Sequence, residues 1–277
     1  MTLVNRIVVF RFDRNPLICR SRVALLRALN PGLQVHGLYG GGRGTRQRLF
    51  RFGSLPLLGL DSLYASPREG RWNWKHGDLA VAAWYREVGR HLDFDVAHLV
   101  EWDLLLLDSL DQVYADVPPD AVALTCLTPV AQLLGSWEWL RTPEGLREWE
   151  SLLSYARRTW NYQDEPLGCI GCGPAFSRAF LDAYARLDPP ELCHDELRLP
   201  LAAQSLGFPL VDTGFRRGWD DPVEDRYFAA NATPIQHETI TDELQRPGGR
   251  RAFHPVRHAF RCPAQPMNPS PSGAHHR

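Results

Sequence analysis

The chain has 277 residues and a formal net charge of −1 at pH 7, and 44% of its residues are hydrophobic. This length suits one large α/β domain or two small ones, and the near-neutral charge argues against a whole-surface nucleic-acid or membrane binder. No apolar run reaches the roughly 18 residues that a membrane-spanning helix needs, and no secretory leader is visible. We therefore expect a cytoplasmic protein whose six cysteines are mostly free thiols.

The apolar pattern predicts strands and helices that alternate along the chain. Strands are expected at 6–12, 33–39, 94–100 and 121–126, and helices at 17–29, 76–91, 143–158 and 174–187. The strand–helix–strand opening implies a parallel pair with a right-handed crossover. We therefore predict a Rossmann-like α/β fold with a mostly parallel central sheet flanked by helices. Residues 1–261 are expected to form one domain, and 262–277, rich in Pro, Ser and Gly, a disordered tail.

Two acidic residues, Glu101 and Asp103, flank Trp102 directly after the apolar strand at 94–100. Side chains alternate along a strand, so the acids should share one side and Trp102 should take the other, with the carboxylates roughly 6 to 7 Å apart. At an effective dielectric of about 20 they repel by roughly 2 to 3 kcal/mol. Such a pair at a sheet end commonly binds a divalent cation that in turn holds a phosphate. The alternative is a solvated acidic turn.

Asp195 and Glu196 form a second acidic pair. One of these carboxylates could take a proton as a general base, or both could simply favour a helix N-terminus. Pro200 lacks a backbone N–H, so the regular helix is expected to begin at residue 200. Cys169 and Cys172 have the spacing of a zinc knuckle or a redox pair, although the glycines around them fit a tight turn equally well.

Several segments, taken in their order, resemble the GT-A glycosyltransferases over roughly residues 6 to 260. They are WNWKHGDLAVAAWY (72–85), FDVAHLVEWDLLLL (94–107), GCIGCGPAFSRAFLDAY (168–184), CHDELRLPLAAQSLGFPLVDTGF (193–215) and AFHPVRH (252–258). Segment 94–107 resembles a variant of the Asp-x-Asp motif with Glu in the first place. Segment 168–184 is similar to a glycine-rich turn followed by a helix on the acceptor side.

The resemblance implies a metal-dependent, hexosyltransferase-like enzyme of GT-A-like fold. It would move a sugar from a nucleoside-diphosphate sugar to a hydroxyl of a small-molecule or glycan acceptor, with no nucleic acid as partner. The implied Mn²⁺ or Mg²⁺ site consists of Asp103, Glu101 and His254, with His258 as a possible substitute for the histidine.

The same resemblance makes Lys75, Asp78 and Glu101 candidates to contact the donor. Trp102 is a further candidate, unless it packs in the sheet. On the acceptor side it implies that Asp195 or Glu196 is the base, with Glu196 preferred.

Two alternatives remain open. Residues 41–46 (GGRGTR) resemble the phosphate-cradling loop of sugar nucleotidylyltransferases, but here the loop follows the second strand, and residues 47–60 contain no lysine. The Glu in place of Asp at position 101 could instead mark a non-catalytic nucleotide-sugar-binding protein. The released product, pyrophosphate or a nucleoside diphosphate, distinguishes the two enzyme classes.

Overall fold

The computed structural model describes residues 4–41, 56–230 and 233–260. Its centre is a seven-stranded sheet with the strand order β3-β2-β1-β4-β7-β6-β8. The strands are β1 (Arg6–Phe12), β2 (Gln34–Tyr39), β3 (Ser62–Ala65), β4 (Val96–Glu101), β6 (Val122–Pro129), β7 (Leu167–Ser177) and β8 (Leu210–Asp212). Strands β3, β2, β1 and β4 are parallel, β8 is parallel to β6, and β7 runs antiparallel to both of its neighbours. The predicted mostly parallel α/β fold is confirmed.

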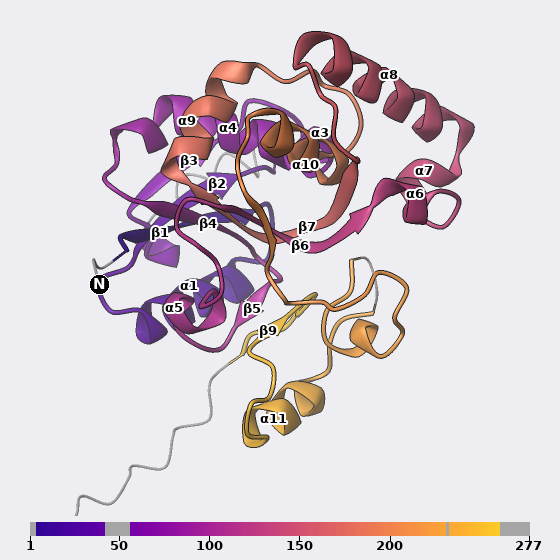
Figure 1. Ribbon diagram of the computed structural model, residues 1–277. Helices are drawn as coiled ribbons and strands as arrows, with labels where there is room; N and C mark the ends of the chain where they lie inside the picture. The colour runs from indigo at the N-terminus through magenta and orange to yellow at the C-terminus, as the bar shows by residue number, and fades with distance from the viewer. Residues whose placement is uncertain (1–3, 42–55, 231–232, 261–277) are drawn as a thin grey trace, which may run out of the picture.

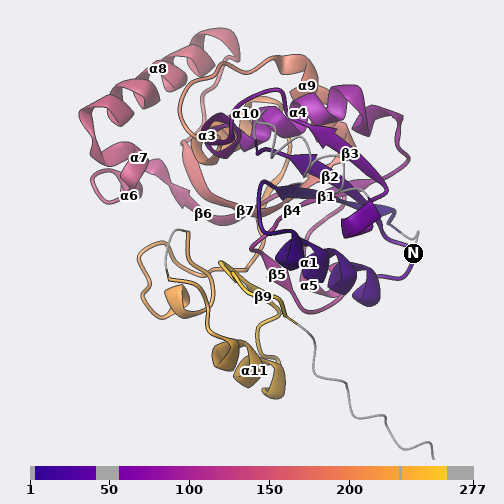
Figure 2. The same ribbon diagram turned by 180° about the vertical axis from the view of Figure 1, so that it is seen from behind.

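Helices cover both faces of the sheet (Figure 1). One face carries α4 (Gly77–Glu87), α9 (Arg178–Leu187) and α10 (Asp195–Ser205), and the other carries α1 (Pro16–Leu29) and α5 (Leu110–Val113), as the reverse view also shows (Figure 2). The alternation along β1 explains this layering. Val8 and Phe10 pack in the core on the α1 side, while Ile7 and Val9 pack with Trp84 of α4.

The remaining elements lie at the periphery of the sheet. They are α3 (Gly70–Lys75), η1 (Gly89–His91), α6 (Val130–Leu133), α7 (Glu138–Arg141), α8 (Pro143–Thr159), η2 (Glu224–Arg226) and α11 (His237–Gln245). Helices α6, α7 and α8 share with α10 a small apolar cluster that includes Trp137, Trp149 and Leu152. No helix in the described ranges is long and apolar enough to cross a bilayer.

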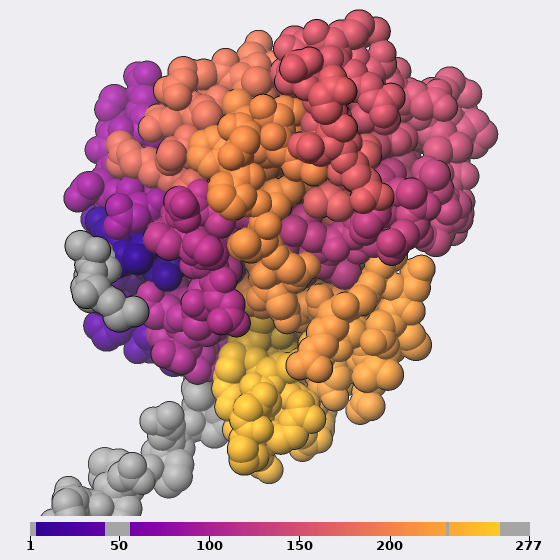
Figure 3. Space-filling view, in the orientation of Figure 1, coloured from indigo at the N-terminus to yellow at the C-terminus, as the bar shows by residue number. Residues whose placement is uncertain are grey.

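A two-stranded ribbon attaches the C-terminal segment to the rest of the molecule. Strand β5 (Leu105–Leu106) pairs antiparallel with β9 (Ala252–Phe253), and the Val256 amide donates to the Asp103 carbonyl at 2.7 Å. The space-filling view shows this segment, in yellow, packed against the body of the molecule (Figure 3). The ribbon therefore places residues near 254 beside the end of β4.

Two predicted helices have different bounds in the structure. The helix expected at 76–91 is α4, which ends at Glu87 and is followed by η1. The Gly77 amide at its start donates to Asp195 across the fold (3.1 Å), which satisfies one of the N-terminal amides that a new helix leaves free. The helix expected at 174–187 begins only at Arg178, because the Ser177 hydroxyl caps it by accepting from the Phe180 amide at 3.2 Å.

Two further expectations are wrong. The glycine-rich turn expected at 168–173 is part of the long strand β7, and the helix that contains Pro200 begins at Asp195 rather than at residue 200. Pro200 cannot donate to the Glu196 carbonyl one turn earlier, but the Cys169 thiol donates to that oxygen instead at 3.4 Å. The helix therefore continues through the proline with this carbonyl satisfied.

Two predictions fall largely outside the described residues. Within the glycine loop at 41–46 only Gly41 is described, and the tail expected at 262–277 is not described at all. The assignment of residues 1–261 to one domain stays a prediction.

Candidate functional site

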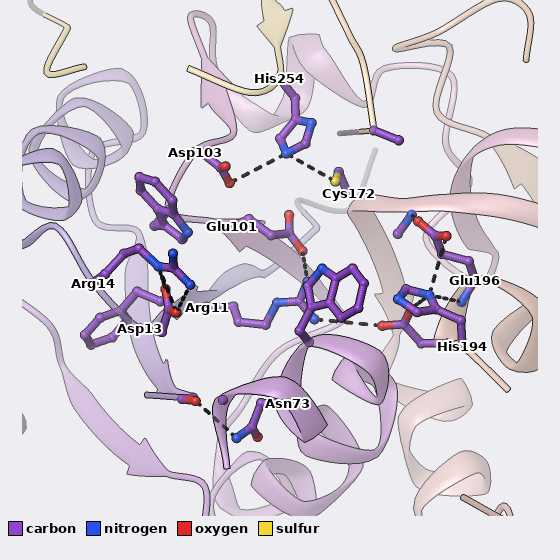
Figure 4. A pocket seen from close by; sticks show the side chains of 18 of the residues that line it. Arg11, Asp13, Arg14, Asn73, Glu101, Asp103, Cys172, His194, Glu196 and His254 are labelled. Atoms are coloured by element: carbon purple, nitrogen blue, oxygen red, sulfur yellow. Dashed lines mark hydrogen bonds and ion pairs between the residues drawn. The ribbon is translucent and has the colours of Figure 1, made fainter. Parts of the chain in front are cut away.

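A cavity of about 430 Å³ opens at the carboxyl ends of three parallel strands (Figure 4). Arg11 and Phe12 end β1, Gly40 follows β2, and Glu101 ends β4; all four line the cavity. Ligands of open α/β sheets collect at this edge, because loops there leave the sheet in different directions. The volume lies within the range of small-molecule sites.

The acidic segment after β4 lines one side of the cavity. Strand β4 stops at Glu101, and the Leu104 amide donates back to the Glu101 carbonyl at 3.0 Å, so the chain turns here. Glu101, Trp102 and Asp103 all reach the cavity. The expected placement of Trp102 on the opposite side is therefore wrong, because strand alternation does not extend through the turn. Trp102 is half-buried and also packs against the core.

Glu101 is buried and engaged by neighbouring groups. Its Oε1 lies 3.3 Å from an Arg11 nitrogen, and its Oε2 accepts from the Gly173 amide at 3.2 Å. Burial raises the pKa of Glu101, and Arg11 and His254 only partly offset this effect. Asp103 differs, because His254 and Arg257, each 3.6 Å away, hold its pKa below the usual range despite burial.

His254 completes this corner of the cavity. Its Nδ1 lies 2.7 Å from the Ala229 carbonyl, and since only a protonated nitrogen can donate to that oxygen, Nε2 is left to face Asp103 and the Cys172 sulfur at 3.4 Å. Burial lowers the pKa of His254, but the Asp103 carboxylate outweighs burial and raises it. Figure 4 shows His254 above Asp103 and Cys172, with Glu101 below them.

The predicted metal site is present only in part. Among the residues that the structure describes, no three His, Cys, Asp or Glu side chains are grouped so as to hold a metal ion. Asp103 and His254 converge, but Glu101 is directed to Arg11 and the Gly173 amide. Two protein ligands of this kind still fit Mg²⁺ or Mn²⁺, which take much of their coordination from water and ligand phosphates.

The opposite side of the cavity is formed by the first turn of α10. His194 Nδ1 lies 2.7 Å from Asp195 Oδ1 and 3.4 Å from Glu196 Oε2. The Trp139 ring stacks on His194 at 4.4 Å and 15°, and Trp74 meets the same imidazole edge-on. Burial raises the pKa of Glu196, whereas His194 holds that of Asp195 below its usual range despite burial.

Arg11 connects the two sides. Its guanidinium lies 3.3 Å from Glu101 and 3.8 Å from Asp195, and both carboxylates are buried. Burial lowers the pKa of Arg11, but the two carboxylates outweigh it, so the pKa is raised and Arg11 stays charged. Two further cations, Arg14 and Arg257, line the cavity near the start of α1 and beside Asp103.

Two predicted donor contacts do not line the cavity. Lys75 forms an ion pair with Glu148 at 2.7 Å. Asp78 is fully buried, where it pairs with Arg198 at 2.5 Å and accepts from the Tyr184 hydroxyl. Asp78 thus anchors α4 to α9 and α10. Neither residue is retained as a donor contact.

The Cys169–Cys172 spacing has a structural explanation. Residues three apart on a strand point to opposite faces, and both cysteines lie in β7. Cys169 is buried and donates to the Glu196 carbonyl, while Cys172 faces His254. Both are free thiols. Since they face opposite ways, they form neither a redox pair nor half of a zinc knuckle.

Sequence reasoning missed four residues that shape the cavity: Arg11, His194, Trp74 and Trp139. Arg11 could have been found, because the strand-end rule that selects Glu101 applies equally to the end of the first predicted strand. His194 directly precedes the predicted acidic pair. Trp74 lies in segment 72–85, where the resemblance pointed to Lys75 and Asp78 instead, and Trp139 lies in a segment with no local signal; only the tertiary fold brings the two tryptophans together.

No protein-family model and no curated protein sequence matches this chain. Among solved structures, the chain is similar to the galactosyltransferase LgtC in complex with donor and acceptor sugar analogs, with 12% identity and a TM-score of 0.39, over 80% of this chain and 74% of that one. It is also similar to the apo structure of the bifunctional glycosyltransferase WbbM, with 11% identity and a TM-score of 0.41, over 91% of this chain and 46% of that one. Likenesses at this level do not decide the activity.

Proposed function

We propose that this protein is a glycosyltransferase that binds a nucleoside-diphosphate sugar in the cavity and transfers the sugar to an acceptor hydroxyl. One observation supports this most directly: a single cavity at the carboxyl ends of three parallel strands has two chemically different sides. One side offers an acid–histidine pair with arginines, and the other offers aromatic rings with a buried acidic cluster. A donor with a diphosphate and an acceptor with a sugar ring need these two kinds of surface.

The first side suits the diphosphate. Arg14 and Arg257 line it, and α1 begins there without an acidic residue in its first turn. Arginine binds phosphate oxygens through paired N–H groups, and the positive end of a helix dipole adds to this attraction. Arg14 donates to the Asp13 carboxylate in this structure, and we expect a diphosphate between Arg14 and Arg257 to compete with that carboxylate for it.

A divalent ion, Mn²⁺ or Mg²⁺, would be held here by Asp103 and His254. When bound, such an ion neutralises the negative charge that develops on a departing diphosphate. The chain's own residues prepare the site. The Ala229 carbonyl fixes the orientation of His254, and Arg11 and the Gly173 amide engage the Glu101 carboxylate.

The second side suits an acceptor. Trp74 is nearly half exposed at the cavity, and Trp139 lies beside it with the ring centroids 5.2 Å apart. Indole faces pack well against the C–H groups of a sugar ring, and the same rings exclude water from the reacting atoms. Behind them lie His194 and the acidic pair. A glycan or a small hydroxylated molecule fits this surface.

Thermal-shift measurements against nucleoside diphosphates, with and without Mn²⁺, test the donor site. A ligand at about 100 times its dissociation constant stabilises the folded state by roughly 2.7 kcal/mol. We expect a Mn²⁺-dependent shift that Asp103→Asn abolishes and that Asp111→Asn, at an exposed aspartate outside the cavity, leaves unchanged. The donor assignment is wrong if no nucleoside diphosphate gives such a shift.

A transfer assay then separates an enzyme from a binding protein. A panel of nucleoside-diphosphate sugars is incubated with glycan and small-molecule acceptors, and the released nucleoside diphosphate is measured. Release that depends on the acceptor supports transfer. Binding without release would instead identify a non-catalytic nucleotide-sugar-binding protein, and pyrophosphate released from a nucleoside triphosphate would favour a nucleotidylyltransferase.

A further inference from the structure

The acidic pair at the start of α10 is fully engaged by the protein itself. Asp195 Oδ2 accepts from the Gly77 amide at 3.1 Å, and its Oδ1 lies 2.7 Å from His194 Nδ1. Glu196 accepts from the Gly171 amide at 2.8 Å and from the Trp139 indole at 3.1 Å. A general base needs a lone pair that the reacting hydroxyl can reach. Three of these four oxygens accept a hydrogen bond, and the fourth, Asp195 Oδ1, is buried in its ion-pair contact with the His194 imidazole.

The free lone pair in this cluster belongs to His194. Its side chain is only 7% exposed and lines the cavity, and within the described residues its Nε2 is buried and has no hydrogen-bond partner. Nδ1 has two polar neighbours, Asp195 Oδ1 at 2.7 Å and the Glu196 amide, which can donate to it, at 3.4 Å. The much shorter contact is with a carboxylate oxygen, which only accepts, so it favours the tautomer with the proton on Nδ1. In the neutral imidazole the lone pair is on Nε2, and Figure 4 shows this nitrogen on the side of the ring away from Glu196.

We propose that His194, rather than either carboxylate, is the catalytic base that deprotonates the acceptor hydroxyl, with Asp195 as its positioning residue. This inference rests on the proposed function. As the acceptor oxygen bonds to the anomeric carbon, the bond from that carbon to the diphosphate oxygen breaks. The hydroxyl proton moves to His194 Nε2 and later passes to solvent, and the nucleoside diphosphate leaves with the bonding electrons.

The surroundings of His194 favour this role. Trp139 stacks on the imidazole and fixes the plane of the ring, while the half-exposed Trp74 meets the ring edge-on at 5.3 Å. The charged groups that face His194 are Asp195 and Glu196 on its own helix, with Arg198 farther along α10. From β1, Arg11 reaches the far oxygen of Asp195. The two carboxylates stabilise the imidazolium that forms when the proton arrives.

Three variants and the wild type test the assignment. His194→Asn keeps an N–H donor toward Asp195 but removes Nε2, Asp195→Asn removes the charge behind the ring, and His91→Asn is a matched control at an exposed histidine outside the cavity. In the acceptor-dependent transfer assay we expect kcat of His194→Asn to fall by roughly 10² to 10⁴, the usual contribution of a general base, while donor KM stays near wild type. The control should match wild type.

The pH profile separates a base from a merely structural histidine. For wild type we expect kcat to rise with pH as His194 loses its proton, and Asp195→Asn should move this rise to lower pH. Long-range ¹H–¹⁵N spectra of the imidazoles, in which His194→Asn identifies the signal, should show the proton on Nδ1. This readout needs no substrate.

Each contrary outcome is informative. Full kcat in His194→Asn, or a neutral His194 imidazole whose proton is on Nε2 in the spectra, overturns the base assignment while leaving the transferase proposal intact. An unmoved pH profile in Asp195→Asn overturns the positioning role. No transfer by wild type with any donor rejects the proposed function, and the base assignment with it.

Discussion

Replacing Arg11 with methionine removes the guanidinium that lies between two buried carboxylates. At an effective dielectric of about 20, unit charges at the observed 3.3 Å and 3.8 Å from Glu101 and Asp195 attract by about 5 and about 4 kcal/mol. The cost of burying the charged guanidinium opposes these two attractions. Removing one partner of a buried ion pair leaves a net cost of about 3–5 kcal/mol. We therefore expect Arg11→Met to lower the free energy of unfolding by about that amount at pH 7.

The loss should depend on pH with a defined sign. Burial raises the pKa of Glu101 even with Arg11 present, so without Arg11 the pKa rises further. An acid whose pKa is raised by folding destabilises the protein above its folded pKa, and this penalty disappears as the pH falls toward its ordinary value of 4.5. The difference between wild type and variant should therefore shrink between pH 7 and pH 5.

Urea unfolding followed by tryptophan fluorescence measures this difference. Adding Glu101→Gln to Arg11→Met should recover part of the stability, because it removes one of the two uncompensated charges. Arg147→Met is the matched control: this exposed arginine pairs with an exposed Glu144, and its variant should unfold at the wild-type urea concentration. A loss below about 1 kcal/mol in Arg11→Met, or a loss equal at pH 7 and pH 5, would refute the ion-pair reasoning.

Two other predictions concern backbone and pH. Gly173 has φ +73°, and an added Cβ would lie 2.8 Å from the Phe215 ring, so Gly173→Ala should cost about 2–4 kcal/mol in urea unfolding. Gly207 has φ +74° with open space around it, so Gly207→Ala should cost only about 1–2 kcal/mol; equal losses would show that the ring contact is unimportant. Burial lowers the pKa of His194, but Asp195 and Glu196 outweigh burial and raise it above its ordinary 6.5. The protonated imidazole therefore stabilises the folded protein fully below pH 6.5, and this stabilisation is lost as the pH rises through the pKa of His194 in the folded state. The free energy of unfolding of wild type should fall over that pH range, and that of His194→Asn should not. The same pH dependence in both proteins would contradict the stabilising role of the His194 imidazolium.

The sequence predicted the elements that have a local pattern. The strands at β1, β2, β4 and β6 follow from short apolar runs, and the rule that ligands bind at strand ends brought Glu101 and Asp103 to the cavity before the fold was known. His254 could be proposed only by resemblance, since its approach to Asp103 depends on the β5–β9 ribbon.

Three of the misplaced features have the same physical cause, which is a partner distant in sequence. The glycines of β7 suggested a turn, but a Cβ at Gly168 would lie 2.8 Å from Leu133, so they provide room for close packing within a strand. Helix α10 continues through Pro200 because the Cys169 thiol satisfies the exposed carbonyl. Lys75 was expected at the donor, yet it pairs with Glu148, 73 residues away. None of these partners can be found by reading a local window.

The ribbon that carries His254 has a consequence for biosynthesis. A chain emerging from the ribosome can assemble the whole central sheet once β8 is available, more than forty residues before His254 is added. Until β9 pairs with β5, the nascent protein has a folded sheet but lacks one member of its Asp103–His254 pair. The Asp103–His254 pair proposed to hold the cation is thus completed in a late step, and a ribosome stalled before residue 254 would present the strands of the central sheet without it.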